Sequence, residues 1–394
     1  MPDGNRYLDA EQIGVRVAII RGGTSKGVFF HDHDIPPPGP VRDALLKRIM
    51  GTPDVMQIDG LGGTHLVTSK IAVVSRAARP DADVEYNFAQ ASVDEDVIDW
   101  SGTCGNLSAA VGPFAIEGGL VRPVEPVTEV RIYNTNTDKV IVAHVPVVNG
   151  RARVKGDFAI GGVPGTGAEI FMDYRLTVGA KTGKALPTGN RRDRIRMGDG
   201  RELDVTICDV ANPVVFVKPE QVGLRGDELP TTLNEPSMTP LYLEVRGKAA
   251  EMVGFVDDWR KADAESPYLP SIFFVSPPSD YTDMSGRTIR AADADIKARQ
   301  IFMNRCNETM PGAGSMCLAA AAHMPGSVVN DVLAEGATER ESLRIAHPNG
   351  IMRLTVATSP ANNPEGIVID RLGFGRTVRR IMDGTVYVPV SDAY

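Results

Sequence analysis

The sequence lacks most features that mark exported, membrane-bound or zinc-binding proteins. It has four cysteines among 394 residues, with no C-x-x-C pair and no paired Cys/His zinc pattern. The N-terminal stretch has no apolar segment of the kind that a secretory signal requires. The longest nearly apolar runs, at 107–116 and 316–324, are far below the ~20 residues that span a bilayer. We therefore expect a cytoplasmic protein with no membrane partner and with reduced cysteines.

Long basic runs and clustered metal ligands are also missing. The net charge is −8, and no stretch interleaves basic with aromatic residues, so we expect no nucleic-acid partner. Six histidines are scattered, and the close pair His31 and His33 lacks the further ligands that a metal site needs, so we expect no metal. The acidic composition still permits a small anionic substrate, because a helix N-terminus or a lysine makes a site locally positive.

Glycine-rich stretches are present, but they do not complete a nucleotide-binding motif. In "RGGTSKGVFF", Gly22 and Gly27 have the spacing of a Walker A loop, yet Val28 stands at the position of the phosphate-binding lysine. The stretch "GGVPGTGAEIF" (161–171) lacks the third glycine of a dinucleotide-binding loop. These stretches are therefore predicted to be loops without a nucleotide.

What the sequence does contain is many short strand-like segments and a few helical ones. The 40 glycines and 28 prolines favour a strand-rich α/β protein with many turns. A polar, basic zone at 180–200 divides the chain near its middle. The expected strands are 15–20, 69–75, 129–135, 139–147, 203–210, 213–217, 271–276, 351–357 and 385–390, and the expected helices are 41–50, 105–117, 248–259, 292–304 and 314–324.

Each half of the chain contains one unusual helix made of small side chains. The stretches "TCGNLSAAVGPFAI" and "GAGSMCLAAAAHMP" both open on glycine with a capping-type residue, and both continue without a polar stripe. Such helices are enclosed on all sides. We therefore expect two similar halves, 1–190 and 191–394, each a curved sheet around a central helix. Whether the terminal segment returns to the first half is left open.

Three residues have both a structural and a functional interpretation. Cys104 lies at a predicted helix N-terminus, where the dipole favours a thiolate, or it is an inert buried cysteine. Lys70, inside a β-branched run, is either the outward member of a strand or a partly desolvated base. Asn212, between two predicted strands, either forms a turn or hydrogen-bonds a carboxylate.

Taken in order, several motifs resemble one known family. These are "RGGTSKGVFF", "DGLGG", "TSKIAVV", "TCGNLSAAVGPFAIEGG", "GVPGTG", "ANPVVFV", "GAGSMCLAAAAHMPGSVVN" and "HPNG", spread over residues 15–380. They are similar to the 2-methylaconitate cis–trans isomerases, a group that includes 3-methylitaconate isomerases, 4-oxalomesaconate tautomerases and aconitate isomerases. The resemblance implies a diaminopimelate epimerase-like fold: two pseudo-symmetric α/β halves, each a mostly antiparallel curved sheet around a central helix.

The resemblance also implies which residues carry the chemistry. Cys104 matches the first of the two catalytic cysteines of diaminopimelate epimerases, but Ala313 stands at the second position. This disfavours two-cysteine epimerisation and implies that Lys70 is the second acid/base. The implied substrate-binding residues are Thr24, Ser25, Lys26, Gly105, Asn106, Asn212, Gly314, Ser315 and Met316.

The function implied by the resemblance is a cofactor-free isomerase of an unsaturated di- or tricarboxylate, of the 2-methylaconitate type, in propionate metabolism. Allylic proton transfer by Lys70 and Cys104 would give cis–trans or 1,3-double-bond isomerisation. Alternatives within the family are 4-oxalomesaconate tautomerase and 3-methylitaconate isomerase. Alternatives from other classes are a Cys–His hydrolase and a non-catalytic carboxylate-binding accessory protein. The sequence does not decide between a monomer and a homodimer.

Overall fold

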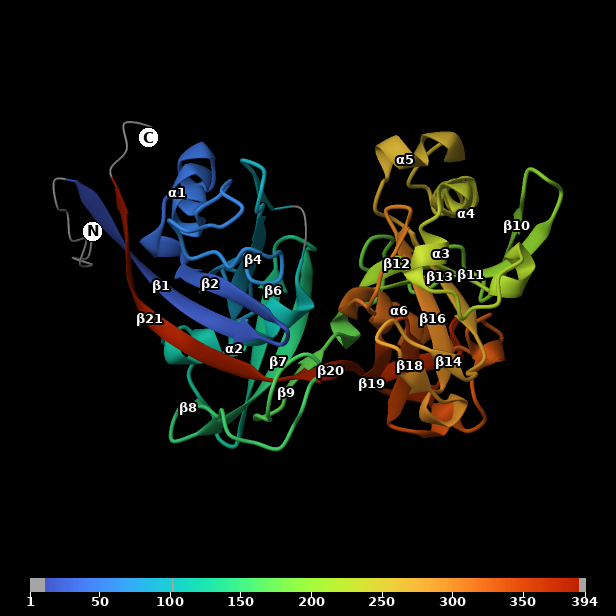
Figure 1. The fold of residues 1–394 in the computed structure, drawn as a ribbon. Helices are drawn as coiled ribbons and strands as arrows, with labels where there is room; N and C mark the ends of the chain where they lie inside the picture. Colours follow the sequence, from blue (N-terminus) through green and yellow to red (C-terminus); the bar gives the residue numbers. More distant parts are fainter. Residues whose placement is uncertain (1–10, 101–102, 390–394) are drawn as a thin grey trace. The chain divides into compact units, whose positions relative to one another are not determined.

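The chain folds into two compact units, seen in a computed structural model that describes residues 11–100 and 103–389 (Figure 1). The first unit runs to Asp173 and resumes at Gly375, and the second is Tyr174–Phe374. The N-terminal stretch 1–10, the two residues before Thr103 and the last residue of the expected strand 385–390 lie outside the described residues.

The sheet of the first unit has a fixed alternation of strand directions. β1/β2 are antiparallel, β2/β3 parallel, β3/β4 antiparallel, β4/β6 parallel and β6/β7 antiparallel. These strands are β1 Gln12–Gly22, β2 Ser25–His31, β3 Lys70–Arg76, β4 Val84–Ala91, β6 Val127–Asn134 and β7 Lys139–Val148. The last strand, β21 (Val378–Pro389), returns to pair antiparallel with β1, as the red and blue ribbons show (Figure 1).

The second unit repeats this alternation in the same chain order. β11/β12 are antiparallel, β12/β13 parallel, β13/β16 antiparallel, β16/β18 parallel and β18/β19 antiparallel. The strands are β11 Glu202–Val210, β12 Asn212–Val217, β13 Ser271–Ser276, β16 Ile296–Phe302, β18 Ser342–His347 and β19 Gly350–Pro360. The expectation of two similar halves is therefore confirmed at the level of strand topology.

An ion pair is repeated along with the strands. In the first unit, Asp83 accepts from Arg131 at the backbone nitrogen (2.8 Å), Nε (3.2 Å) and Nη2 (2.7 Å). In the second unit, Asp295 accepts from Arg344 at the same three atoms, at 2.8, 3.1 and 2.7 Å. Each aspartate directly precedes the fourth strand of the pattern, and each arginine lies on the fifth. Matching side-chain geometry at matching positions supports an internal duplication.

A central helix is enclosed in each unit. All residues of α2 (Gly105–Glu117) from Leu107 to Ile116 are buried, as are all residues of α6 (Gly312–Ala322) from Gly314 onward. Helices α1 (Pro40–Met50) and α4 (Thr239–Met252) cover the two cores from outside. The remaining strands and α-helices among the described residues are β5 Ile98–Asp99, β8 Arg151–Ala152, β9 Ile170–Asp173, β10 Asp193–Arg196, β14 Tyr281–Thr282, β15 Thr288–Ile289, β17 Arg305–Cys306, β20 Ile367–Arg376, α3 Pro230–Leu233 and α5 Ala262–Glu265.

Two expected helices are wrong. The segment 292–304 contains strand β16, and the expected helix 248–259 covers only the end of α4. Strand β16 lies between β13 and β18, and its charged side chains Lys297 and Arg299 are buried. Lys297 donates to Ser279 Oγ at 2.6 Å, and Arg299 Nε donates to the Glu228 carbonyl at 2.7 Å. A local pattern assigns such charged residues to a helix surface, whereas here they bond partners distant in the sequence. No helix among the described residues is long and apolar enough to cross a bilayer.

Candidate active site

The hairpin that joins β1 to β2 is shaped so that the central helix of the first unit lies directly against it. Gly22 and Ser25 form the last pair of the hairpin. A Cβ on Gly22 would lie 2.5 Å from the backbone oxygen of Asn106, and one on Gly23 would lie 2.3 Å from the side-chain oxygen of Asn106. Gly23 also has φ +52°, a conformation that favours glycine. Glycine is therefore required for the first turn of α2 to touch this hairpin.

The same hairpin also contains the spacing G-x-S-x-G, at residues 23–27. In serine hydrolases this spacing places the nucleophile on a sharp strand-to-helix turn. Here Ser25 is instead the first residue of strand β2 in an antiparallel hairpin. The local backbone therefore differs from a nucleophile elbow.

Cys104 is the residue that precedes the first turn of α2. Its backbone is extended, and its carbonyl accepts hydrogen bonds from the amide and hydroxyl groups of Ser108, both at 2.9 Å. The Sγ atom of Cys104 lies 3.8 Å from Ser25 Oγ, and both side chains are buried. Unpaired amides and the dipole at a helix N-terminus favour a thiolate. Cys104 is therefore a buried cysteine that lies at a helix N-terminus, next to the β1–β2 hairpin.

Asn106, in the first turn of α2, is held by two partners from other parts of the sequence. Its side-chain nitrogen donates to Thr24 Oγ1 at 3.0 Å, and its oxygen accepts from Arg376 Nε at 2.8 Å. Arg376 ends β20 and is a candidate that the sequence motifs miss. The sequence signal that could identify Arg376 is the stretch "GFGRT", which contains glycines next to an arginine, as the hairpin stretch "RGGTS" does.

Positive charge collects around the same hairpin. The guanidinium of Arg21 donates to the carbonyl oxygens of Gly23 and Thr377, at 3.0 and 2.6 Å. Burial, and next the charge of Arg379, lowers the pKa of Arg21. Together with Arg376, this arginine makes the start of α2 a suitable place for a carboxylate.

Lys26, also predicted as a binding residue, lies on strand β2 beside the loop at 60–68. Its backbone nitrogen donates to the Val67 carbonyl at 2.9 Å. A Cβ on Gly63 would lie 3.2 Å from Lys26 Nζ, so the ammonium reaches this loop. Lys26 is therefore a third cation of the hairpin region.

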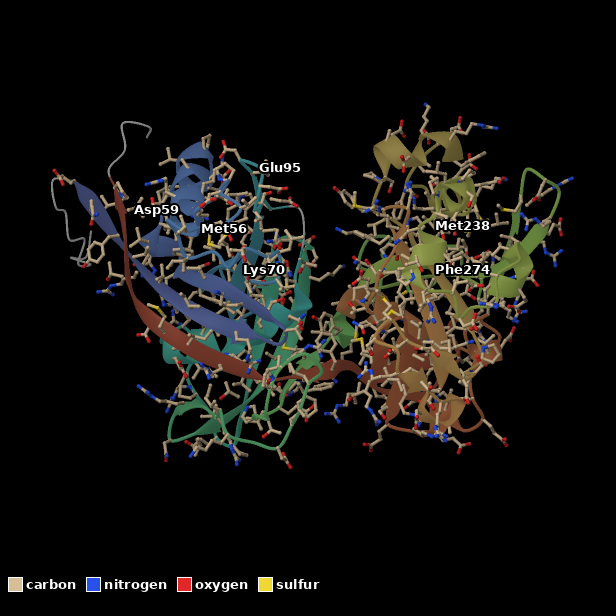
Figure 2. The ribbon with its side chains drawn as sticks, viewed as in Figure 1. Met56, Asp59, Lys70, Glu95, Met238 and Phe274 are labelled. Atoms are coloured by element: carbon tan, nitrogen blue, oxygen red, sulfur yellow. The ribbon has the colours of Figure 1, made fainter. Side chains whose placement is uncertain are left out.

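Lys70 is the first residue of strand β3 (Figure 2). Its parallel neighbour on β2 is Gly27, and its antiparallel neighbour on β4 is Gln90. Lys70 Nζ donates to Gln90 Oε1 at 2.8 Å and lies 5.1 Å from the centre of the Phe88 ring. Because Leu107 of α2 packs where a Gly27 side chain would be, Lys70 starts its strand next to the N-terminal part of α2.

The predicted residues of the second unit lie at the start of α6 and in one tight turn. Helix α6 begins at Gly312, two residues before the expected start, and Ser315 donates its amide and hydroxyl to the Pro311 carbonyl at 3.1 and 2.8 Å. This matches the bonds from Ser108 to Cys104, so Pro311 rather than Ala313 corresponds to Cys104. Pro311 and Ala313 both lack a thiol.

This register decides which amides at the start of α6 are available to an anion. The Ser315 amide is used within the helix, whereas the amides of Gly312 and Gly314 belong to the first turn, where intrahelical acceptors are missing. Met316 is fully buried one residue further on. Asn212 begins β12 directly after Ala211, which has φ +63° in the turn from β11.

The other three cysteines are buried, and two of them have environments that suppress thiolate formation. Burial raises the pKa of Cys306 to about 12. Burial also raises the pKa of Cys317 well above its ordinary value, and its thiol donates to the Cys208 carbonyl at 3.1 Å. Cys208 is fully buried as well. These three residues are core cysteines.

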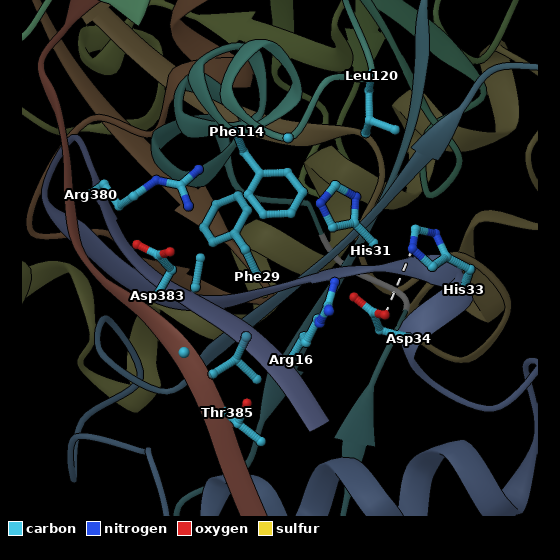
Figure 3. A pocket seen from close by; sticks show the side chains of 14 residues that line it. Arg16, Phe29, His31, His33, Asp34, Phe114, Leu120, Arg380, Asp383 and Thr385 are labelled. Atoms are coloured by element: carbon cyan, nitrogen blue, oxygen red, sulfur yellow. Dashed lines mark ion pairs between the residues drawn. The ribbon is translucent and has the colours of Figure 1, made fainter. Parts of the chain in front are cut away.

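A cavity of about 640 Å³ lies elsewhere in the first unit, beside the C-terminal part of α2 (Figure 3). Phe114 and His31 form its aromatic wall, with ring centres 4.6 Å apart. Burial is the largest cause of a lowered His31 pKa, opposed by Asp34. Arg16 and Arg380 also line the cavity, but none of the predicted site residues does. The cavity is therefore separate from the hairpin region.

Comparison with known proteins gives matches over almost the whole chain. A 3-methylitaconate isomerase from Eubacterium barkeri is 43% identical, covering 96% of this chain and 98% of the relative. A 2-methyl-aconitate isomerase from Cupriavidus necator is 38% identical, covering 97% and 99%. The crystal structure of a methylitaconate-delta-isomerase superposes with a TM-score of 0.87 at 42% identity, covering 97% and 98%.

The duplicated fold and these relatives define the class: the protein is an isomerase. The family model described as PrpF protein matches residues 12–389, and the chain belongs to that family. The predicted resemblance to 2-methylaconitate isomerases and their relatives is therefore confirmed.

Proposed function

We propose that this protein isomerises an unsaturated di- or tricarboxylate by moving an allylic proton with Lys70 and Cys104. The observation that carries the proposal is the hairpin of β1 and β2. Cys104 touches it through Ser25, and Lys70 pairs with its Gly27. The names of the relatives, 3-methylitaconate isomerase and 2-methyl-aconitate isomerase, describe this class of substrate.

The proposed chemistry needs only protein side chains. One of Lys70 and Cys104 takes the proton from the carbon next to the C=C bond, and the C–H electron pair spreads over the allyl system into a carboxylate. A proton returned to the same carbon after rotation gives cis–trans isomerisation. A proton returned at the far end moves the double bond by a 1,3-shift. A positioned acid/base pair typically contributes about 10²–10⁴ in rate.

The charge that develops on the carboxylate oxygens is stabilised by groups around the start of α2. The amides of Gly105 and Asn106 are in its first turn, and Arg376 is bonded to Asn106. Thr24 and Lys26 of the hairpin belong to the same proposed binding set. For Asn212, Gly314, Ser315 and Met316 in the second unit, a binding role stays a prediction.

The test is a substrate panel followed by proton NMR in deuterated buffer. Cis- and trans-aconitate, 2-methylaconitate, 3-methylitaconate and 4-oxalomesaconate are incubated with the protein and with Lys70→Ala and Cys104→Ala. We expect deuterium to enter the allylic position of one substrate with the parent protein and with neither variant. The position of the new double bond separates cis–trans isomerase, 1,3-isomerase and tautomerase. Binding without exchange would instead indicate an accessory protein.

A further inference from the structure

The side chain of Gln90 is held in a single orientation beside Lys70. Its amide nitrogen donates to the carbonyl oxygens of Leu66, Ser69 and Ala91, at 3.1, 2.8 and 3.1 Å. Carbonyl oxygens only accept, so a flipped amide would place its own oxygen against three acceptors. The amide oxygen is therefore fixed toward Lys70, whose Nζ donates to it at 2.8 Å.

The environment of Lys70 makes this contact important. On one side, the neighbouring residue is Gly27, which has no side chain. On the other, Gln90 supplies the hydrogen-bond acceptor, and Phe88 places its ring 5.1 Å from Nζ. Because an amide oxygen accepts only, the lysine turns an N–H toward it whether the amine is charged or neutral. The lone pair of a neutral Lys70 then points away from Gln90.

We propose that Gln90 is a positioning residue for Lys70: it directs the amine lone pair for proton transfer and keeps the amine able to change its charge. A neutral amide suits this role better than a carboxylate. A carboxylate would strongly favour the ammonium form, and it has no hydrogens for the three carbonyl oxygens. This inference rests on the proposed function of Lys70.

The test combines two variants of Gln90 with a matched control. Gln90→Met keeps the length but removes acceptor and donors, and Gln90→Glu adds a charge. The control is Gln221→Met in the second unit, where a half-buried glutamine accepts from the Asp204 amide at 2.8 Å and donates to the Asp204 carbonyl at 3.0 Å. The readouts are kcat, KM, thermal unfolding, and titration of the Lys70 side chain by ¹³C NMR, with its signal assigned from Lys70→Arg.

We expect opposite shifts in the two variants. Gln90→Met removes an acceptor from the charged form, so the pH midpoint of the Lys70 titration falls by about half a unit, whereas Gln90→Glu raises it by about one unit or more. In Gln90→Met, kcat falls by about tenfold or more while KM changes less than about threefold, because orientation rather than binding is lost. Gln221→Met leaves kcat and the midpoint at their parent values.

Two results would overturn the proposal: midpoints that stay at the parent value in both Gln90 variants, or a Gln90→Met kcat equal to that of the Gln221→Met control. A failure of the proposed function has a different signature. In that case Lys70→Ala keeps its turnover, while the titration shifts still report on the contact between Gln90 and Lys70.

Discussion

The starts of the two central helices show how the halves of this protein differ. Before α2 stands Cys104, and before α6 stands Pro311; in each case a serine four residues later donates to that residue's carbonyl. The backbone arrangement is therefore shared, but the thiol is not. In the first unit the helix start also touches Ser25 and is linked through Asn106 to an arginine.

The two halves therefore share a framework but differ in the chemical groups at the helix starts. The strand order and the Asp–Arg pairs are common to both halves, and both belong to the framework of the sheets. The cysteine of α6 is instead Cys317, which lies inside the helix and is fully buried. Having one thiol at a helix start, with Lys70 in the adjoining sheet, is consistent with an isomerase that does not use a pair of cysteines.

The largest predicted effect separates Cys104 from Cys317. We expect Cys104→Ala to lower kcat by about 10²–10⁴, because the proton-transfer thiol is lost. Its thermal stability should be close to that of the parent protein, since the contact recorded for Sγ is a long one to Ser25, at 3.8 Å. We expect Cys317→Ala to keep its kcat within about twofold and to cost about 1 kcal/mol of stability by leaving a small core void.

The measurements are steady-state kinetics on the substrate identified by the NMR panel and thermal unfolding of both variants. If Cys104→Ala turned over within about tenfold of the parent, its acid/base role would be wrong. A large loss of kcat in well-folded Cys317→Ala would contradict the assignment of proton transfer to Cys104 rather than to Cys317.

A second comparison concerns the repeated ion pair. The Asp295 side chain is fully buried and also contacts Arg340, whereas that of Asp83 is 29% exposed. We expect Asp295→Asn to lower the free energy of unfolding by about 2–3 kcal/mol, because Arg340 and Arg344 lose the charge of the fully buried carboxylate that they share. Asp83→Asn should cost about 1 kcal/mol or less, since water screens the pair. Urea unfolding measures both, and equal losses would contradict the argument from burial.

How much of this was predictable from the sequence depends on where the partners lie. Helix α2 was expected at 105–117 and is found there, because its start and its small side chains are encoded locally. Strand β16 is missed because Lys297 and Arg299 are buried and donate to residues 18 and 71 positions away. Local sequence patterns predict a helix or strand correctly when its apolar residues face the core and its polar residues face water. They fail for an element such as β16, in which charged side chains are buried.

The candidate site follows the same rule. Cys104 and Lys70 stand in recognisable motifs, and the structure locates both beside the β1–β2 hairpin. Arg376 could not be found in this way, because 270 residues separate it from Asn106. Gln90 resembles any polar residue of an alternating strand until the register of β3 and β4 places it opposite Lys70. Pairing across strands, not local sequence, determines these contacts.

The smallest predicted effect is a difference in acid stability between the parent and Asp295→Asn. Burial alone would raise the pKa of Asp295, but hydrogen bonds from the Arg344 side chain and backbone, with the charges of Arg344 and Arg340, outweigh it and lower the pKa below 3.8. A carboxyl group with a lowered folded pKa stabilises the protein fully above its unfolded pKa, and this stabilisation is lost as the pH falls through the folded value. Between pH 7 and about pH 4, the difference in unfolding free energy between parent and variant should therefore be constant. Below that it should shrink, because the parent takes up a proton at Asp295 that the variant cannot. Urea midpoints measured at successive pH values test this, and a difference that grows toward low pH would contradict it.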